Sequence, residues 1–160
     1  MLRKVISGGQ AGADRAGLDF ALEIGLEHGG YAPKGRKAED GRIDDRYQLV
    51  ELPSASYPTR TKRNVRASDG TAIFSLRADL TGGSALTLAY ARNVKKPVIH
   101  LHASDEGRAD PAAQLKDFIT ANRVGVLNVA GSRASKEPGV YEFTLGVLRR
   151  YWREHQRRNA

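Results

Sequence analysis

The stretch VISGGQAGADRAGLDFALEIG, residues 5–25, decides the fold class, because it has the pattern of a strand, a glycine turn and a helix in direct succession. We expect the strand over residues 4–7 and a helix from Asp14, which would cap it, to about Leu26. The expected buried face of this helix consists of Leu18, Ala21, Leu22 and Leu26. Because glycine turns between a strand and a helix often bind phosphate, the same stretch raises a functional question.

The rest of the chain alternates between the same two kinds of element. Further strands are expected at residues 28–32, 71–76, 96–101 and 124–129. Four further helices are expected. The first covers residues 61–68, the second carries Leu86, Ala89 and Tyr90 on one face, the third begins at Asp110 and the fourth follows Gly139. Between them, residues 33–59 form a long polar segment of the kind that is usually functional or disordered. The alternation predicts an α/β fold with a parallel sheet, and 160 residues suffice for one domain, residues 1–160.

The composition excludes several kinds of chemistry. Without cysteine the chain has no disulfide, no thiolate nucleophile and no iron–sulfur cluster. The four histidines lack the spacing of metal ligands, so we expect no metal site. No apolar run approaches the roughly 18 residues that cross a bilayer, so we expect a cytoplasmic protein that does not contact membranes.

The formal net charge of +8 and the pI of about 10.0 suit either a nucleic-acid binder or a cleft for anions. A C-terminal cluster, best explained as a helix end where the dipole favours cations, consists of Arg149, Arg150, Arg153, Arg157 and Arg158. The basic residues of the middle segment, such as Lys34, Arg36 and Arg60, are better candidates for ligand binding. Few aromatic side chains accompany them for stacking on bases, so we expect no nucleic-acid partner.

Three glycine-bearing loops leave the carboxyl ends of expected strands. They are residues 8–12, residues 81–84 and residues 130–133. Ligand crevices of open parallel sheets lie beyond the carboxyl ends of the strands, so we expect the loops to converge on one crevice. The first two loops lead into helices, whose free N–H groups would face that crevice. One glycine turn is as readily explained by tight packing, but two such turns and a basic segment favour an anion site.

The first loop differs from the two best-known phosphate-binding motifs. It lacks the Gly-Lys-Ser/Thr ending of nucleoside triphosphatases. Gly8, Gly9 and Gly12 also lack the spacing of the dinucleotide-binding fingerprint. We therefore expect neither triphosphate hydrolysis nor NAD-dependent redox chemistry.

Six parts of the chain carry a family resemblance when they are taken together and in order. They are GGQAGADRAGLD (8–19), PKGRKAEDG (33–41), RT with NV (60–61 and 64–65), SDGT (68–71), TGGS (81–84) and LNVAG (127–131). This set resembles the molybdenum carrier proteins, the circularly permuted YpsA-type branch of the SLOG superfamily, which is related to the LOG or lysine decarboxylase-like proteins. The chain departs from the family's usual pattern at Ala11, where threonine is common, and at Ser84, which also replaces threonine.

The resemblance implies a single Rossmann-like domain of three layers, with a mostly parallel sheet flanked by helices. It also implies a phosphate-bearing or nucleotide-derived ligand, and the named candidate is the molybdenum cofactor (molybdopterin), which carries a terminal phosphate. We accordingly expect a binding or carrier protein that assembles as a homo-oligomer, a dimer or a tetramer.

Our hypothesis places the phosphate between the first two loops. Backbone N–H groups of residues 9–13 and 82–84 would hold it, and the hydroxyls of Ser84 and Thr87 would add donors. The expected binding residues are Gly8, Gly9, Gln10, Gly12, Ala13, Asp14, Lys34, Gly35, Arg36, Thr81, Gly82, Gly83, Ser84, Thr87, Gly131, Ser132 and Arg133.

Basic side chains would complete this site. Lys34 and Arg36 would close over the anion, and Arg36 could bind it with two parallel hydrogen bonds. Arg15 would either do the same or pair with Asp19 at i+4. Arg133, with Ser132, would approach from the last strand.

An enzyme of the LOG type is the alternative. By the same resemblance, some LOG relatives remove the base from a nucleoside monophosphate with an arginine and a glutamate near a Pro-Gly-Gly-x-Gly-Thr loop. The corresponding loop here, TGGSAL at residues 81–86, lacks the matching glycine and threonine, and no glutamate partner is evident. Asp14 could act as a base if it were desolvated. We therefore favour binding without catalysis.

Overall fold

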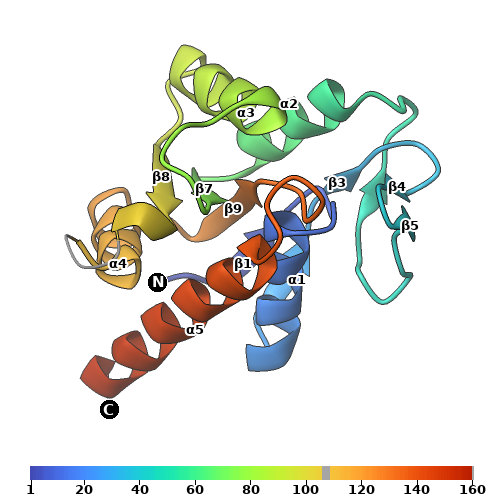
Figure 1. Ribbon diagram of the computed structural model, residues 1–160. Helices are drawn as coiled ribbons and strands as arrows, with labels where there is room; N and C mark the ends of the chain where they lie inside the picture. Colours follow the sequence, from blue (N-terminus) through green and yellow to red (C-terminus); the bar gives the residue numbers. More distant parts are fainter. Residues whose placement is uncertain (106–108, 160) are drawn as a thin grey trace.

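A five-stranded parallel sheet forms the centre of the computed structural model, which describes residues 1–105 and 109–159 (Figure 1). The strands are β1 (Lys4–Ile6), β2 (Glu27–Gly29), β7 (Gly70–Ser75), β8 (Val98–His102) and β9 (Val126–Gly131). Their order across the sheet is β2-β1-β9-β7-β8, and each pairing is parallel. All residues of β7 are buried, as expected of a strand that is covered on both faces.

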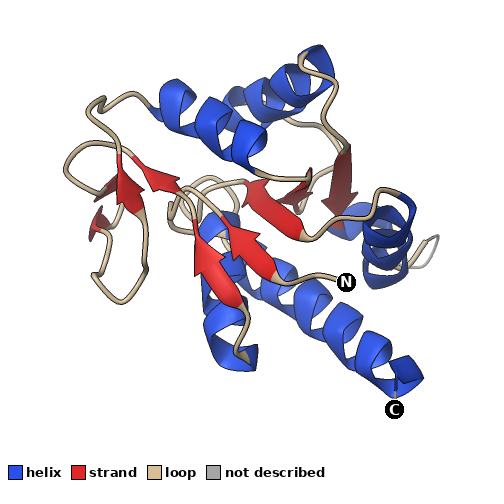
Figure 2. Cartoon of the chain, turned by 180° about the vertical axis from the view of Figure 1, so that it is seen from behind, coloured by secondary structure: helices blue, strands red, loops and turns tan. Residues whose placement is uncertain are grey.

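Helices cover both faces of this sheet. One face carries α1 (Ala13–Ile24), α4 (Pro111–Ala121) and α5 (Val140–Asn159), and the other carries α2 (Tyr57–Ala67) and α3 (Gly82–Asn93) (Figure 2). A short 3-10 helix, η1 (Ala103–Asp105), follows β8. The predicted α/β, Rossmann-like arrangement of three layers is therefore confirmed.

Helix α1 begins slightly earlier than expected and has a different cap. Its N-cap is Gly12, which has no side chain, so the prediction that Asp14 caps the helix is wrong. The helix ends at Ile24, and its C-cap Gly25 has a φ of 75°, the left-handed conformation that favours glycine. Leu18 and Ala21 are buried as predicted, whereas Leu22 is 42% exposed.

The segment between Pro33 and Thr59 is a folded lobe and not a structureless loop. Two small sheets organise it: β3 (Tyr31–Ala32) pairs with β6 (Val50–Glu51), and β4 (Lys37–Ala38) pairs with β5 (Gly41–Arg42). Ala32, Ala38, Ile43 and Tyr47 of this lobe form an apolar cluster with Leu18 of α1, and Leu49 packs against it. We call residues 31–51 the hairpin lobe; it lies beside the central sheet in both views. Of the two expectations for this segment, functional or disordered, disorder is therefore wrong; such short strands and a small core give only a weak periodic signal in the sequence.

One further helix prediction needs correction. Helix α3 buries Ser84, Thr87 and Ala91, and Ala89 of the expected apolar face is exposed. In α5, Tyr151 is buried and Trp152 packs edge-on against Phe20, with ring centroids 6.3 Å apart. Both rings therefore belong to the fold of one chain.

The basic end of α5 is partly paired. Arg149 lies 2.8 Å from a carboxylate oxygen of Glu23, and Arg150 lies 3.0 Å from one of Asp110. The side chains of Arg157 and Arg158 lie outside the described residues. Within the described part of the chain, none of the helices combines the length and the apolar character that crossing a membrane requires.

Candidate functional site

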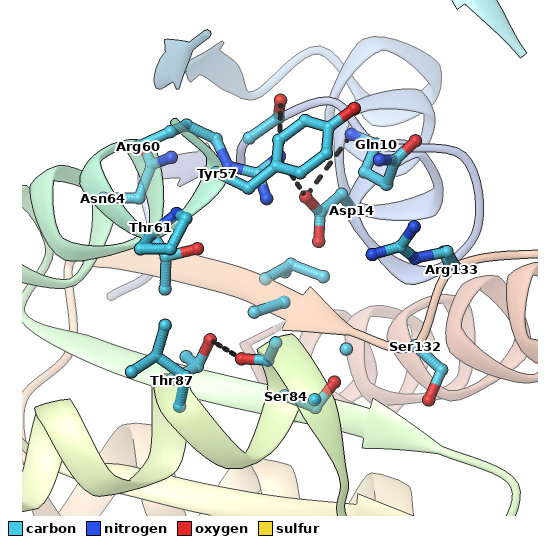
Figure 3. A pocket seen from close by; sticks show the side chains of 18 of the residues that line it. Gln10, Asp14, Tyr57, Arg60, Thr61, Asn64, Ser84, Thr87, Ser132 and Arg133 are labelled. Carbon is cyan, nitrogen blue, oxygen red and sulfur yellow. Dashed lines mark hydrogen bonds and ion pairs between the residues drawn. The ribbon is translucent and has the colours of Figure 1, made fainter. Parts of the chain in front are cut away.

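A crevice of about 350 Å³ lies at the carboxyl ends of β1, β7 and β9 (Figure 3). All three predicted loops line it, through Gly8 and Gln10, through residues 81–84, and through residues 130–133. Helices α2 and α3 form its other walls. The structure thus brings the three loops together where the topology predicted.

The second glycine loop, residues 81–84, opens directly on the crevice. Thr81 is the N-cap of α3, and its side chain makes no capping hydrogen bond. Gly82 has a φ of 55°, which favours glycine, and a Cβ added at Gly83 would meet nothing within 4 Å. The N–H groups in the first turn of a helix have no partner inside the helix, so those of residues 82–84 are available to a ligand in this space.

In the first glycine loop, residues 8–12, backbone N–H groups donate to acceptors within the protein instead. The N–H of Gly9 donates to Ser7 Oγ (3.2 Å), that of Gln10 to Asp14 Oδ2 (3.4 Å), and that of Ala11 to Gln10 Oε1 (3.0 Å). The N–H of Ala13 donates to the carbonyl of Ser132. For Gly9, Gln10, Ala11 and Ala13, four of the five residues 9–13, the hypothesis that the N–H group holds phosphate is therefore wrong, because each of these N–H groups already has an acceptor.

Steric contacts explain the glycines of this first loop without a ligand. A Cβ at Gly9 would lie 2.8 Å from Leu49 and 2.9 Å from Ile43, both in the hairpin lobe. At Gly12 a Cβ would lie 2.5 Å from the backbone oxygen of Ser132. Ala11 is buried and does not line the crevice, so its missing hydroxyl does not bear on this space.

Arg60 of α2 and Asp14 of α1 form a buried pair at the crevice wall. Arg60 Nη1 lies 3.5 Å from Asp14 Oδ2 and donates to the carbonyl of Gly8 at 3.3 Å. The two residues are 9% and 7% exposed. Burial raises the pKa of the Asp14 carboxyl above its ordinary value, although the Arg60 charge acts in the opposite direction. A Cβ at Gly8 would lie 2.3 Å from Arg60 Cδ, so a larger residue there would displace the Arg60 side chain.

Two cations from the loop after β9 border the second glycine loop. The ammonium group of Lys136 donates to the Thr81 hydroxyl and lies 3.3 Å from where a Cβ of Gly82 would be. Arg133 is exposed and points toward the crevice (Figure 3). Ser132 points away, because its hydroxyl donates to Glu137 at 2.5 Å. Of the expected pair, only Arg133 therefore offers its side chain to the crevice.

A clasp from the hairpin lobe holds this cationic loop. Glu39 accepts hydrogen bonds from the N–H and the hydroxyl of Ser135, at 3.0 and 2.5 Å. The N–H of Glu39 in turn donates to Gln10 Oε1 at 2.8 Å. The first glycine loop is thereby linked to the segment that carries Arg133 and Lys136.

Lys34 and Arg36, which were expected to close over the anion, do not line the crevice. Arg36 is 8% exposed, and its guanidinium donates to the carbonyls of Ile43 (3.0 Å), Asp44 (2.7 Å) and Tyr47 (2.8 Å). These bonds hold the hairpin lobe together, so the prediction that Arg36 binds the anion is wrong. Lys34 is exposed, the N–H of Gly35 donates to Glu51, and neither residue lines the crevice.

Two other polar side chains also differ from expectation. The Thr87 hydroxyl donates to the carbonyl of Gly83 at 2.9 Å, so its hydrogen is not available to a ligand. Arg15 pairs with Asp40 at 3.0 Å and not with Asp19, and it also donates to the carbonyl of Gly9.

Several lining residues were outside the expected set: Tyr57, Thr61, Asn64, Asn128 and Lys136. The first three belong to α2, which begins earlier than predicted. The sequence contained a signal for this earlier helix start. Ser56 is the N-cap and accepts from the N–H of Thr59, and Pro58 stands in the first turn. Among the described residues, no group of three or more His, Asp or Glu side chains could hold a metal ion.

Comparisons with known proteins agree with this architecture. The model of the circularly permutated YpsA SLOG family matches residues 5–152. A crystal structure from Syntrophus aciditrophicus SB, of a protein provisionally named a molybdenum carrier protein, is 44% identical, with 94% of each chain covered and a TM-score of 0.89. A search of curated proteins found no match.

Proposed function

The chain belongs to the circularly permutated YpsA SLOG family, and on that premise we propose that it is a binding or carrier protein whose crevice holds a small phosphorylated ligand. One observation carries the proposal: the first turn of α3 faces the crevice without a side-chain cap, beside the cations of Lys136 and Arg133. A helix N-terminus offers N–H donors and a positive partial charge, which together suit a phosphate.

The charges of the crevice support an anionic ligand. Arg60, Arg133 and Lys136 line it, and Asp14 is the carboxylate among the lining residues. In a partly enclosed space such cations attract an anion more strongly than they would in open water. The phosphate would occupy the end of the crevice at residues 82–84.

Two ligands fit this proposal: a nucleotide-derived molecule and the molybdenum cofactor. The name of the 44% identical protein favours the second. With no cysteine in the chain, the cargo would be held by its phosphate and its pterin and not by a thiolate on the metal. Residues 82–84 are suited to the phosphate, and the polar wall formed by α2 is suited to the ring system.

Calorimetric titration with AMP, GMP and inorganic phosphate tests the proposal. Lys136→Ala removes a cation beside residues 82–84 and should weaken phosphate binding about tenfold, since a hydrogen bond to a charged group contributes roughly 1.5–3 kcal/mol. Lys34→Ala is the matched control, because it removes an exposed cation outside the crevice and should leave affinity unchanged. Equal losses in both variants, or no binding by the unaltered protein, would refute the proposal.

Native mass spectrometry of gently purified protein complements this titration. A bound mass would identify the ligand directly. The same spectrum would count the subunits, for which we propose a dimer or a tetramer.

A second function, nucleotide hydrolysis of the LOG type, is favoured by one observation. Asp14 is a desolvated carboxyl with a raised pKa beside Arg60, and such a group can act as a general acid or base. Chromatography of AMP after incubation with the protein is the test. If the protein releases adenine from AMP and Asp14→Asn abolishes the release, the chain is an enzyme. If AMP remains intact, hydrolysis is excluded and the carrier function stands.

A further inference from the structure

Asp14 presents one carboxylate oxygen to the protein and the other to the crevice. Oδ2 receives the N–H of Gln10 at 3.4 Å and lies 3.5 Å from Arg60. The second oxygen points into the space between α2 and α3 (Figure 3). The residue is only 7% exposed, so beside the N–H groups of Gln10 and Gly8, which are directed at the carboxylate, this oxygen meets whatever occupies the crevice.

A buried carboxylate is a poor neighbour for a phosphate. Like charges repel strongly in a partly enclosed space, so the phosphate belongs at residues 82–84, where the N–H groups and Lys136 lie. The crevice is therefore chemically two-ended, with anion-binding groups at α3 and a hydrogen-bond acceptor at Asp14. A ligand that fills it needs a phosphate at one end and an N–H or O–H donor at the other.

The wall near Asp14 also contains an aromatic ring. Tyr57 lines the crevice, and the guanidinium of Arg60 lies 5.3 Å from its ring centroid. The ring and the guanidinium of such a pair are both flat and polarisable, so they favour a flat partner. Thr61 adds a hydroxyl on the same helix. The head group that fits beside these residues is a planar heterocycle.

We propose that Asp14 selects the ligand by accepting a hydrogen bond from an amino-substituted heterocycle, the 2-amino-4-oxopyrimidine edge that guanine and pterins share. The carboxylate oxygen that faces the crevice would accept from one of the adjacent N–H donors of this edge, and a carboxylate has no hydrogen to set against them. The inference rests on the proposed function, because it assumes that the phosphate of the same ligand lies at residues 82–84.

The test compares GMP with XMP, which carries a carbonyl oxygen in place of the 2-amino group. Titration of the unaltered protein should show GMP binding about tenfold more tightly, because XMP sets an oxygen against the carboxylate. With Asp14→Asn, XMP should bind more tightly than GMP. The Asn side-chain oxygen can stay beside Arg60, and the NH₂ group then faces the crevice, where it can donate to the carbonyl oxygen of XMP. Asp45→Asn, in an exposed residue of the hairpin lobe, is the matched control and should keep the original order.

Inorganic phosphate separates the possible failures. If phosphate binds but GMP and XMP bind equally, or XMP binds more tightly to the unaltered protein, the role of Asp14 is refuted and the phosphate site stands. If phosphate does not bind either, both proposals fail. The GMP and XMP comparison in the unaltered protein remains decisive even if Asp14→Asn does not fold. A parallel titration with 6-hydroxymethylpterin phosphate shows whether the pterin or the guanine source of this edge binds more tightly.

Discussion

The loop of residues 8–12 and the loop of residues 81–84 share many features. Each contains a Gly-Gly pair, follows a strand of the central sheet and leads into a helix of 12 residues. In the first loop, the N–H groups of Gly9, Gln10 and Ala11 have protein acceptors. In the second, the helix begins without a side-chain cap and faces open space. The N–H groups of a glycine turn are therefore open to a ligand only where they lack protein partners.

A pair of glycine variants gives the largest expected contrast between the two loops. Gly12→Ala should lower the free energy of unfolding by about 4 kcal/mol, because it adds strain at a φ of 111° to a Cβ contact of 2.5 Å with backbone. Gly83→Ala should change stability by less than about 1 kcal/mol, since its Cβ meets nothing. Its Cβ would instead enter the space that we propose for the phosphate and should weaken phosphate binding. Urea denaturation and calorimetry measure the two effects, and an equally unstable Gly83→Ala would erase the contrast.

Arg36→Ala tests whether a basic residue near the first loop serves the fold or the ligand. The substitution leaves the carbonyls of Ile43, Asp44 and Tyr47 without their donor, so we expect a loss of about 3 kcal/mol in unfolding free energy. Phosphate affinity of the folded fraction should not change. If Arg36→Ala instead lost much of its affinity for phosphate while its unfolding free energy stayed unchanged, Arg36 would be a ligand-binding residue after all.

The ionisation of Asp14 reports how strongly the carboxyl beside the first loop is desolvated. Burial raises the pKa of its carboxyl above the ordinary 3.8, so the folded state binds this proton more tightly than the unfolded state does. The stability that this group contributes is therefore greatest in acid and is lost as pH rises from about 4 toward the folded pKa. Denaturation between pH 4 and pH 7 should show the unaltered protein losing stability relative to Asp14→Asn. A constant difference would contradict the desolvated state of Asp14.

The clasp of Glu39 gives the smallest expected effect. Glu39→Ala releases Ser135 and lets the segment with Arg133 and Lys136 move, so phosphate should bind about two- to threefold more weakly. Stability should fall by less than about 1 kcal/mol, as is usual for exposed pairs. Glu23→Ala, which removes an exposed partner of Arg149, is the control and should not affect affinity. Equal affinities in both variants would show that the clasp does not position the cations.

The sequence predicted the layers and the position of the crevice because both follow from local patterns. Buried runs such as residues 71–76 mark strands, and Asp110 with Pro111 marks a helix start that the structure confirms. The resemblance to the circularly permuted YpsA family is likewise confirmed by the match over residues 5–152. Parallel strands then bring their carboxyl ends, and the loops that follow, to one edge.

The roles of individual side chains were harder to predict because their partners are distant in sequence. Arg36 stands in a basic run that suggests an anion clamp, but its guanidinium meets carbonyls of the same lobe. The N–H of Ala13 finds its acceptor at Ser132, which no local pattern reveals. Side chains with several rotatable bonds can serve either purpose, and only the folded lobe decides which.

Amide chemical shifts during titration with inorganic phosphate test the central contrast most directly. In a two-dimensional ¹⁵N–¹H spectrum, the amides of Gly82, Gly83 and Ser84 should shift progressively, while those of Gly9 and Ala11 stay in place. Shifts in the first loop with none at residues 82–84 would contradict the account.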